Sequence, residues 1–362
     1  MQRRKFINAA TVGSGAALLA NTGRAQQPAP ADQIRWRMIA VVPKSLDTIY
    51  GTAERFSKRV LEATNGRLLI SVSGPGEIVP PNEAFNAVQQ GSVDCAFTAG
   101  TINFGKDPTF ALDSVIPFGM NSRQMSAWMF AGGGMQLMRE FHRDYDILGF
   151  PCGNTGAQMA GWFRKEITSV SDLKGLKFRI GGFGGVVLSK LGVVPQNIPG
   201  GDVYTALERG VLDAAEWIGP HDDEKLGFAK VAKYYYYPGF WEGSSQISIY
   251  VNIKKWEALP RDIQSVIEAA AFEGHTEMQA RYDALNPIAL KRLIAGGTTL
   301  KAFPQPVLKA AWDAANETYE ELSAKNAKWK KIYDSFVKFR DDEIAWFRVT
   351  EGSFDAFMRS VR

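Results

Sequence analysis

The chain has 362 residues, of which 45% are hydrophobic and 22% charged, and a formal net charge of +4. This length allows two lobes with separate cores, and the composition excludes a low-complexity or disordered chain. Four cations without an accompanying acid lie within the first 25 residues, so the remainder is formally neutral and gives no reason to expect a nucleic-acid partner.

The first 25 residues are predicted to be an export signal. They begin with basic residues, continue with a short run rich in Ala, Leu and Gly, and reach a small-residue site at Ala25. Arg3-Arg4, followed by "KFI", resembles the twin-arginine signal, although Gln2 stands where Ser or Thr is usual. The apolar run is too short to span a bilayer. The alternative is a basic terminal segment without structure; export is favoured and predicts a periplasmic protein.

A first α/β lobe is predicted over residues 33–156, after a linker at 26–32 that is rich in Pro, Ala and Gln. Strand patterns in "IRWRMIAVVP", "RLLISVSG" and "SVDCAFT" alternate with helical patterns in "LDTIYGTAERFSKRVLEATNG" and "NEAFNAVQQ". This order is typical of a parallel sheet covered by helices. A further strand pattern, "DILGFPCGN", leads out of the lobe.

A second α/β lobe is predicted over residues 157–249. Its strand patterns are "LKFRI", "VVPQNIP" and "LDAAEW", and helical patterns in "FGGVVLSKLG" and "DVYTALERG" separate them. The segment "QISIYVNIKKWEAL" is predicted to be a long strand that returns to the first lobe, so residues 250–304 form the return and hinge helices. Residues after about 257 are expected to be helical, with a long helical tract over 305–362. Two lobes joined by crossing strands predict a cleft that closes on a ligand.

The two lobes repeat one helix–glycine–strand unit. Aligning "QQGSVDCAFT" with "ERGVLDAAEW" places Gly91 against Gly210 and Asp94 against Asp213. The same alignment places Phe97 against Glu216, so only the second copy ends in a charged residue. This difference indicates that the second strand end serves a purpose other than core packing.

The two cysteines, Cys95 and Cys152, are predicted to be buried thiols. They are too few for a metal cluster and lack the CxxC redox spacing. Both lie in apolar strand patterns, and a disulfide between them is the alternative in an oxidising compartment.

Ligand-binding candidates lie where the second-lobe strands end. Arg179 ends "LKFRI", and Glu216-Trp217 ends "LDAAEW", so both reach the edge of the sheet at which ligands of parallel sheets bind. The planar fork of an arginine matches the two oxygens of a carboxylate. The structural alternatives are a surface ion pair for Arg179, a solvent-exposed acid for Glu216 and a core aromatic for Trp217.

An exported enzyme is the alternative class. The glycine-rich stretches "GGFGGV" and "GPGEIV" both fail the dinucleotide-binding pattern, and the chain has no P-loop, no GxSxG and no Cys/His ligand set. A binding protein is therefore favoured over an enzyme.

Two stretches, "DLKGLKFRI" and "ERGVLDAAEWIGP", resemble the signature segments of solute receptors of TRAP (tripartite ATP-independent periplasmic) transporters. "AEWIGPHDDEKLGFAKVAKYYYYPGFWEG" further resembles the branch that binds 2-oxo acids together with a cation. The resemblance implies a two-lobed α/β periplasmic binding-protein fold with crossing hinge strands, a long C-terminal helix and membrane permease subunits as partners. The sequence departs from the family pattern at "RIGGFGG", where many members have a Pro. This difference affects the expected geometry of the loop but not the match of the arginine.

The resemblance also implies roles for individual residues. Arg179 matches the arginine that grips the ligand carboxylate, and the cation and substrate positions match Gln158, Glu216-Trp217 and Glu242. Asn103 and Asn154 are additional candidates for amide contacts with the ligand.

The charges at these positions favour a cation. Two ionised glutamates and a monocarboxylate ligand leave a net negative charge around one arginine, and a closed cleft does not tolerate buried unpaired charge. The resemblance favours Na⁺ and a pyruvate-like 2-oxo acid; Ca²⁺ with a 2-hydroxy acid such as lactate, and protonation of one carboxylate, are the alternatives. On this hypothesis Glu216 is charged because it faces ligand, whereas Phe97 faces core.

The C-terminal helical tract carries a series of apolar residues that allows two interpretations. The helix folds on its own lobe, or it packs on a second subunit and forms a homodimer, which is the favoured prediction. The apolar positions are Leu308, Trp312, Tyr319, Leu322, Trp329, Ile332, Phe336 and Phe339.

Overall fold

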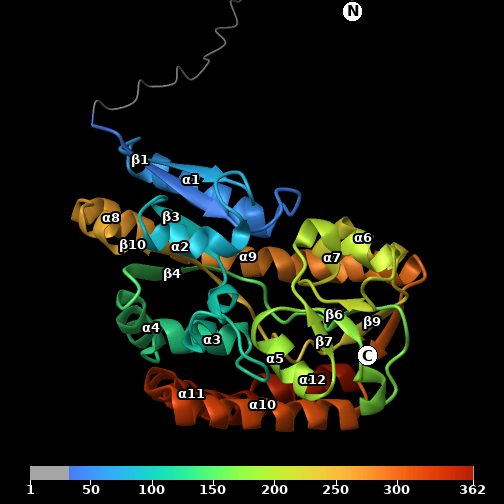
Figure 1. The fold of residues 1–362 in the computed structure, drawn as a ribbon. Helices are drawn as coiled ribbons and strands as arrows, with labels where there is room; N and C mark the ends of the chain where they lie inside the picture. The colour runs from blue at the N-terminus through green and yellow to red at the C-terminus, as the bar shows by residue number, and fades with distance from the viewer. Residues whose placement is uncertain (1–31, 362) are drawn as a thin grey trace, which may run out of the picture.

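The computed structural model describes residues 32–361 (Figure 1). The predicted export signal and the first six residues of the predicted linker lie outside this part of the chain. The described residues form two β-sheets with helices packed on them.

The first sheet has five strands in the order β2-β1-β3-β10-β4. Strand β1 is parallel to β2 and β3, whereas β10 is antiparallel to β3 and β4. The long return strand is therefore confirmed, although it ends at Asn252, whose side chain accepts hydrogen bonds from the N–H groups of Lys254 and Lys255 and starts the next helix. The strands are β1 Ile34–Ala40, β2 Leu68–Ser73, β3 Cys95–Thr98, β4 Ile147–Asn154 and β10 Gln246–Asn252.

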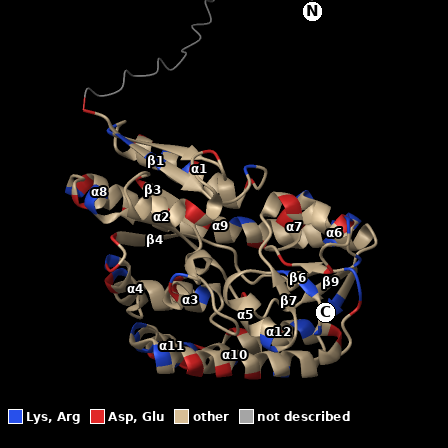
Figure 2. Cartoon of the chain, viewed as in Figure 1, with Lys and Arg blue, Asp and Glu red and all other residues tan. Residues whose placement is uncertain are grey.

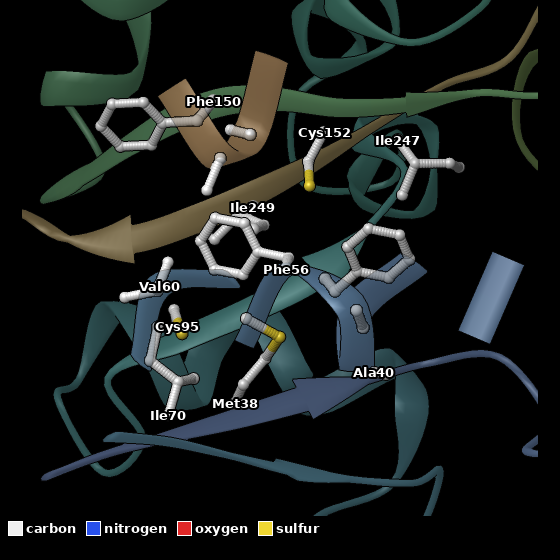
Figure 3. Close-up of a cluster of buried hydrophobic side chains, with 14 of the residues drawn as sticks. Met38, Ala40, Phe56, Val60, Ile70, Cys95, Phe150, Cys152, Ile247 and Ile249 are labelled. Atoms are coloured by element: carbon white, nitrogen blue, oxygen red, sulfur yellow. The ribbon is translucent and has the colours of Figure 1, made fainter. Parts of the chain in front are cut away.

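Two apolar cores join this sheet to its helices: one contains residues of α1 (Figure 3), and the other contains residues of α2, α3 and α4. Met38, Ile70 and Ile249 from the sheet pack with Phe56 and Val60 of the first helix, and each is almost wholly buried. The helices of this half are α1 Ile49–Ala63, α2 Ala84–Gln89, α3 Ser122–Phe130, α4 Gly134–Arg143 and α8 Ile253–Glu257.

The two cysteines lie in the core that contains residues of α1 and are not bonded to each other. Cys95 and Cys152 are free thiols on β3 and β4, and both are fully buried. Burial raises the pKa of each thiol above its ordinary value. The prediction of buried thiols is confirmed.

The second sheet has six strands in the order β11-β9-β5-β8-β6-β7. Three of them, β5, β9 and β11, are absent from the sequence prediction, and β11 interrupts the C-terminal region that was expected to be wholly helical. The strands are β5 Gly161–Phe163, β6 Lys177–Arg179, β7 Val194–Gln196, β8 Ala214–Ala215, β9 Tyr234–Tyr237 and β11 Thr299–Ala302; the helices are α5 Gly182–Lys190, α6 Val203–Glu208 and α7 Pro220–Leu226.

Long C-terminal helices connect the two halves (Figure 1). Helix α9, Arg261–Ala295, packs on β4 and α1 of the first half and on α7 of the second. Helix α10, Gln305–Lys325, packs on α5, whereas α11, Ala327–Val349, packs on α3 and α4; α12 spans Glu351–Ser360. The expected long C-terminal helical region is present, and it ties the two sheets together.

The surfaces of α10 and α11 carry both signs of charge (Figure 2). Pairs one helical turn apart, such as Lys309 with Asp313 and Lys330 with Asp334, face solvent on these helices. Among residues 32–361 no helix combines the length and the apolar character that crossing a membrane requires.

The repeated helix–glycine–strand unit has the same backbone in both halves. Gly91 and Gly210 have φ values of 72° and 71°, in the left-handed region that favours glycine. Asp94 Oδ2 accepts a hydrogen bond of 2.7 Å from the N–H of Arg37, and Asp213 Oδ2 accepts one of 2.9 Å from the N–H of Lys177. Each aspartate thus binds the neighbouring parallel strand, and the predicted repeat is confirmed.

Candidate ligand and cation site

Arg179, the last residue of β6, lies against the end of the adjacent strand β8. Its Nη1 donates hydrogen bonds to the backbone oxygen of Glu216 at 2.6 Å and to Glu216 Oε2 at 3.1 Å. The guanidinium also lies 4.8 Å from the centre of a Trp217 ring, a distance typical of a cation–π contact. Arg179, Glu216 and Trp217 therefore form one cluster, as predicted from their positions at the ends of two strands.

Trp217 fits this cluster because Gly200, which lies against its indole, has no side chain. A Cβ atom at Gly200 would lie 2.3 Å from the indole, so any larger residue there would displace the ring. The indole also contacts the apolar cores of both halves of the molecule. Trp217 consequently links the guanidinium to the packing between the two sheets.

Two glutamates share this region, and both have raised pKa values. Glu216 is 5% exposed, and its burial and the nearby charge of Glu242 raise the pKa of its carboxyl well above the ordinary value, with Arg179 opposing the shift. Burial raises the pKa of Glu242 to about 7, against the opposing effects of Arg179 and a hydrogen bond with Ser245. A single arginine therefore does not compensate both acids when they are ionised.

Gln158 connects the segment that carries Glu242 to the segment that follows β4. Its N–H donates to the backbone oxygen of Glu242 at 3.1 Å, and its own backbone oxygen accepts from the N–H of Gly239 at 3.2 Å. The side-chain Nε2 donates to Thr155 Oγ1 at 3.1 Å. The side-chain Oε1 is buried and has no hydrogen-bond partner among residues 32–361.

These groups fit a hard cation. Carboxylate and amide oxygens are the ligands that Na⁺-like and Ca²⁺-like ions prefer, and the unpartnered Oε1 of buried Gln158 is an oxygen that such an ion would satisfy. Residues 32–361 contain no group of three or more His, Cys, Asp or Glu side chains arranged for a metal. An ion bound here would therefore need amide and backbone oxygens in addition to Glu216 and Glu242.

The two asparagine candidates occupy different positions. Asn154 ends β4, is fully buried, and accepts a hydrogen bond from the N–H of Gly156 through Oδ1, which leaves its Nδ2 without a partner among the described residues. Asn103 ends the short 3₁₀ segment Gly100–Asn103, is 7% exposed, and also has an unpartnered Nδ2. No hydrogen bond within residues 32–361 joins the side chain of Asn103 to Arg179.

The segment that carries Asn103 nevertheless contacts the second lobe close to Arg179. Phe104 packs edge-on against Phe183 of α5, with ring centres 4.8 Å apart. A Cβ atom at Gly182 would lie 2.4 Å from Thr101 Oγ1, so the absence of a side chain allows this close approach. The "GGFGG" segment therefore forms a tight contact between the lobes.

Several polar residues in and around this region were not identified from the sequence. Thr155 and Ser245 are hydrogen-bonded to each other, although both resemble ordinary loop residues in the sequence. Asp223 was also missed: it is buried and accepts hydrogen bonds from Trp162 Nε1 at 2.9 Å and Tyr235 O–H at 2.7 Å. The pattern "HDDEK" is typical of a solvent-exposed helix, and nothing in it signals a buried acid.

The fold and the site place the chain among periplasmic solute receptors. The model of the family described as bacterial extracellular solute-binding protein, family 7 (DctP), matches residues 39–326, and the chain belongs to this family. It is a solute receptor of the TRAP type and not an enzyme, so both predictions are confirmed, as is the two-lobed α/β fold.

Individual relatives are similar over almost their whole length. A monocarboxylate 2-oxoacid-binding periplasmic protein from Nostoc sp. (strain PCC 7120) is 44% identical over 99% of this chain and 100% of its own. A TRAP transporter solute-binding protein from Bordetella bronchiseptica RB50, a mixed-occupancy dimer with copurified calcium and picolinate in an active site, is 51% identical with a TM-score of 0.89, covering 91% of this chain and 98% of that one. A TRAP periplasmic protein from Pseudoalteromonas atlantica T6c with bound sodium and pyruvate is 37% identical with a TM-score of 0.86, covering 89% and 98%.

Proposed function

We propose that this receptor binds a small 2-oxo monocarboxylate, such as pyruvate, together with a cation, for uptake by a TRAP transporter. The observation that carries this function is one arginine, Arg179, beside the buried Glu216 and the partly buried Glu242, whose combined charge it cannot balance. The relatives support it: one is named for 2-oxoacid binding and another holds sodium and pyruvate.

Each residue of the site has a separate role in this proposal. The Arg179 guanidinium grips the ligand carboxylate with its planar fork. The unpartnered Nδ2 groups of Asn103 and Asn154 are donors for the ligand's oxygens. The oxygens that would hold the cation are those of Gln158, Glu216, Glu242 and the Trp217 carbonyl.

Either of two cations fits the charge of the site. A monovalent ion such as Na⁺ reduces the excess negative charge around Arg179, whereas Ca²⁺ removes it for a monocarboxylate ligand. Relatives hold sodium in one case and calcium in another. With Ca²⁺, a 2-hydroxy acid such as lactate is the alternative ligand, since it offers the same pair of neighbouring oxygens.

Ligand identity is testable on purified protein. Mass spectrometry of the small molecules released on denaturation, with metal analysis of the same sample, should find a short 2-oxo acid and Na⁺ or Ca²⁺. Added pyruvate should raise the melting temperature in the presence of the cation, because a ligand that binds only the folded state stabilises it. If no short oxo or hydroxy acid changes the melting temperature, the proposed ligand class is wrong.

Residues 1–25 are proposed to direct export to the periplasm through the twin-arginine route, after which the receptor delivers its ligand to the membrane permease subunits. Replacing both Arg3 and Arg4 by lysine should stop export. Unchanged export of this variant would contradict the twin-arginine assignment.

We also propose the lobe boundaries that the sequence predicts. Strand β4 ends at Asn154 and β5 begins at Gly161, which supports a boundary between residues 156 and 157. The return to the first sheet begins at Gln246, four residues before the proposed boundary at 250.

A homodimer through the C-terminal helices is also proposed, but its contact surface differs from the one predicted from the sequence. Four of the apolar positions expected to face a partner, Tyr319, Trp329, Ile332 and Phe336, are buried in the chain's own core. Of the predicted positions Trp312 on α10 is exposed, and further exposed apolar residues lie at the end of α11, on α12 and directly after it: Ile344, Trp346, Val349, Phe354, Phe357 and Val361. The dimeric relative from Bordetella bronchiseptica supports this state.

Sedimentation at micromolar concentration tests the dimer. Phe354→Asp should convert a dimer into a monomer, because it places a charge on the apolar surface of α12. Val194→Asp, at an exposed position of the second lobe, is the matched control and should leave the oligomeric state unchanged. A monomeric wild-type protein would contradict the proposal.

A further inference from the structure

The hydroxyl of Thr155 lies where the segment that follows β4 meets the segment that leads into β10. Thr155 is 2% exposed and follows the last residue of β4. Its Oγ1 accepts hydrogen bonds from Gln158 Nε2 and from the backbone N–H of Ser245, both at 3.1 Å, and its hydroxyl donates to the backbone oxygen of Gly156 at 2.9 Å. The hydrogen-bonding capacity of this side chain is therefore fully used.

These contacts determine which end of the Gln158 amide faces Thr155. The one hydroxyl proton is committed to Gly156, so towards Gln158 the hydroxyl oxygen can only accept. In the opposite amide orientation two oxygen acceptors would meet, unless the hydroxyl gave up its bond to Gly156. The contact therefore selects the orientation with Nε2 towards Thr155 and Oε1 on the other side.

The selected orientation leaves an oxygen available for a ligand. Gln158 Oε1 is buried and unpartnered within residues 32–361, which is costly unless another group satisfies it. A cation accepts electron pairs from oxygen and cannot bind the N–H₂ end of the amide. The amide orientation consequently decides whether Gln158 can serve as a cation ligand.

Thr155 also fixes the segment that carries Glu242. Its N–H donates to the backbone oxygen of Ser245 at 3.0 Å, which together with the Oγ1 contact makes a two-bond connection between the two segments. Ser245 lies on the same segment as Glu242, three residues further along the chain. The backbone bond from Gln158 to Glu242 closes this network.

We propose that Thr155 is a positioning residue for the cation site: its hydroxyl orients the Gln158 amide so that an oxygen, and not the amino group, faces the ion. This role rests on the proposed function, because it requires a cation held by Gln158. Outer residues that orient metal ligands typically contribute 10–100-fold to metal affinity.

Calorimetric titration of Ca²⁺, and separately of Na⁺, into metal-stripped protein without any organic acid tests this role. Thr155→Val keeps the shape and removes the hydroxyl, and should weaken binding of the cation by about 10–100-fold. Thr155→Ser keeps the hydroxyl and should bind within a few-fold of wild type. Thr318→Val is the matched control, because Thr318 is also a buried hydroxyl bonded to a backbone oxygen, but it lies on α10.

A double-mutant cycle separates orientation of Gln158 from a general effect on folding. In a Gln158→Ala background, Thr155→Val should cause little further loss of cation affinity, because the amide that it orients is gone. If Thr155→Val does not fold, as judged by thermal unfolding, Thr155→Ala removes the same hydroxyl without the added methyl group and takes its place.

The outcomes distinguish the two proposals. Cation affinity equal to wild type in Thr155→Val, or an equal loss with and without Gln158, would overturn the role of Thr155 while leaving the cation site intact. A wild-type protein that binds neither Ca²⁺ nor Na⁺, with or without pyruvate, would instead overturn the proposed cation and with it the basis of this role.

Discussion

The strand end of the first repeated unit and that of the second share a backbone and differ in chemistry. Counting from the matched aspartates, Phe97 corresponds to Glu216, and on the adjacent strand Ile39 corresponds to Arg179. Ile39 and Phe97 are buried among apolar side chains, whereas Arg179 and Glu216 bind each other. One framework thus builds a core in the first lobe and a charged site in the second.

This difference shows what the charged residues cost and why they are kept. A buried ion pair gives little net stability compared with apolar residues of similar size, because both charges lose their hydration. Stability alone therefore does not explain Arg179 and Glu216, whose positions the first lobe fills with Ile39 and Phe97. The proposed ligand binding would explain them. Exchanging residues between the two copies tests this comparison.

The largest effect is expected when the acid is moved into the first lobe. Phe97→Glu would bury a carboxylate in an apolar cluster that offers no arginine, and it would also remove a ring that is 1% exposed. We expect the free energy of unfolding to fall by at least about 4 kcal/mol, measured by chemical denaturation. Phe97→Leu, which stays apolar, should cost clearly less; equal losses in the two variants would contradict this account of the core.

Arg179→Ala is expected to have the next largest effect, on binding. Losing a charge-assisted pair with the ligand carboxylate in a closed site should cost about 2–5 kcal/mol, which is well over tenfold in affinity for pyruvate. The cation site should remain partly intact, because its proposed ligands are other residues. Arg37→Ala removes an exposed arginine from the matching strand of the first lobe and is the control; a similar loss of pyruvate affinity in both variants would exclude a specific grip by Arg179.

Glu216→Gln should lower the affinity for the cation by more than about tenfold and make pyruvate affinity more dependent on cation concentration. Linkage requires the converse as well, since pyruvate must tighten the cation by the same factor. Calorimetric titration of pyruvate into metal-stripped protein, with and without Na⁺ or Ca²⁺, measures this coupling. Equal pyruvate affinities in all three conditions would show that no cation bridges ligand and protein.

The raised pKa values of the two glutamates give these effects a pH dependence. Because the pKa of Glu242 is raised to about 7, and that of Glu216 is also raised, the metal-free protein should lose stability as the pH rises from the ordinary range of glutamate towards about 7. Cation affinity should rise over the same range, since the acids must lose their protons to bind it. In Glu216→Gln both trends should be shallower; a pH-independent cation affinity in wild type would exclude these acids as ligands.

The comparison between the copies also shows how much of the molecule the sequence could predict. The repeat, the parallel strands and the positions of Arg179 and Glu216 follow from local patterns and from the unequal strand ends. The short strand β5, at Gly161–Phe163, has too few residues for a periodic pattern, and the run of tyrosines in β9 has no polar alternation.

Residues that act through distant contacts were not predictable. Thr155 and Ser245 are 90 positions apart, and their bond exists only because β4 and β10 pair in the folded sheet. The burial of Asp223, on α7, depends likewise on Trp162 of β5 and Tyr235 of β9. The spacing of residues along the chain does not indicate such long-range contacts. The positions of Gln158 and Glu242 came from the resemblance to a family.

The smallest expected effect tests what the two copies share. Asp94 and Asp213 each accept a hydrogen bond from the N–H of a neighbouring strand, so Asp94→Ala and Asp213→Ala should each lower the free energy of unfolding by about 1–3 kcal/mol. Asp94 also pairs with half-exposed Lys255, which should add at most about 1 kcal/mol to its loss. The corresponding asparagine variants keep an acceptor oxygen and should recover part of the stability. Chemical denaturation of the four variants measures these losses, and a difference between the two alanine variants well above that margin would mean that the matching aspartates are not equivalent parts of one repeated framework.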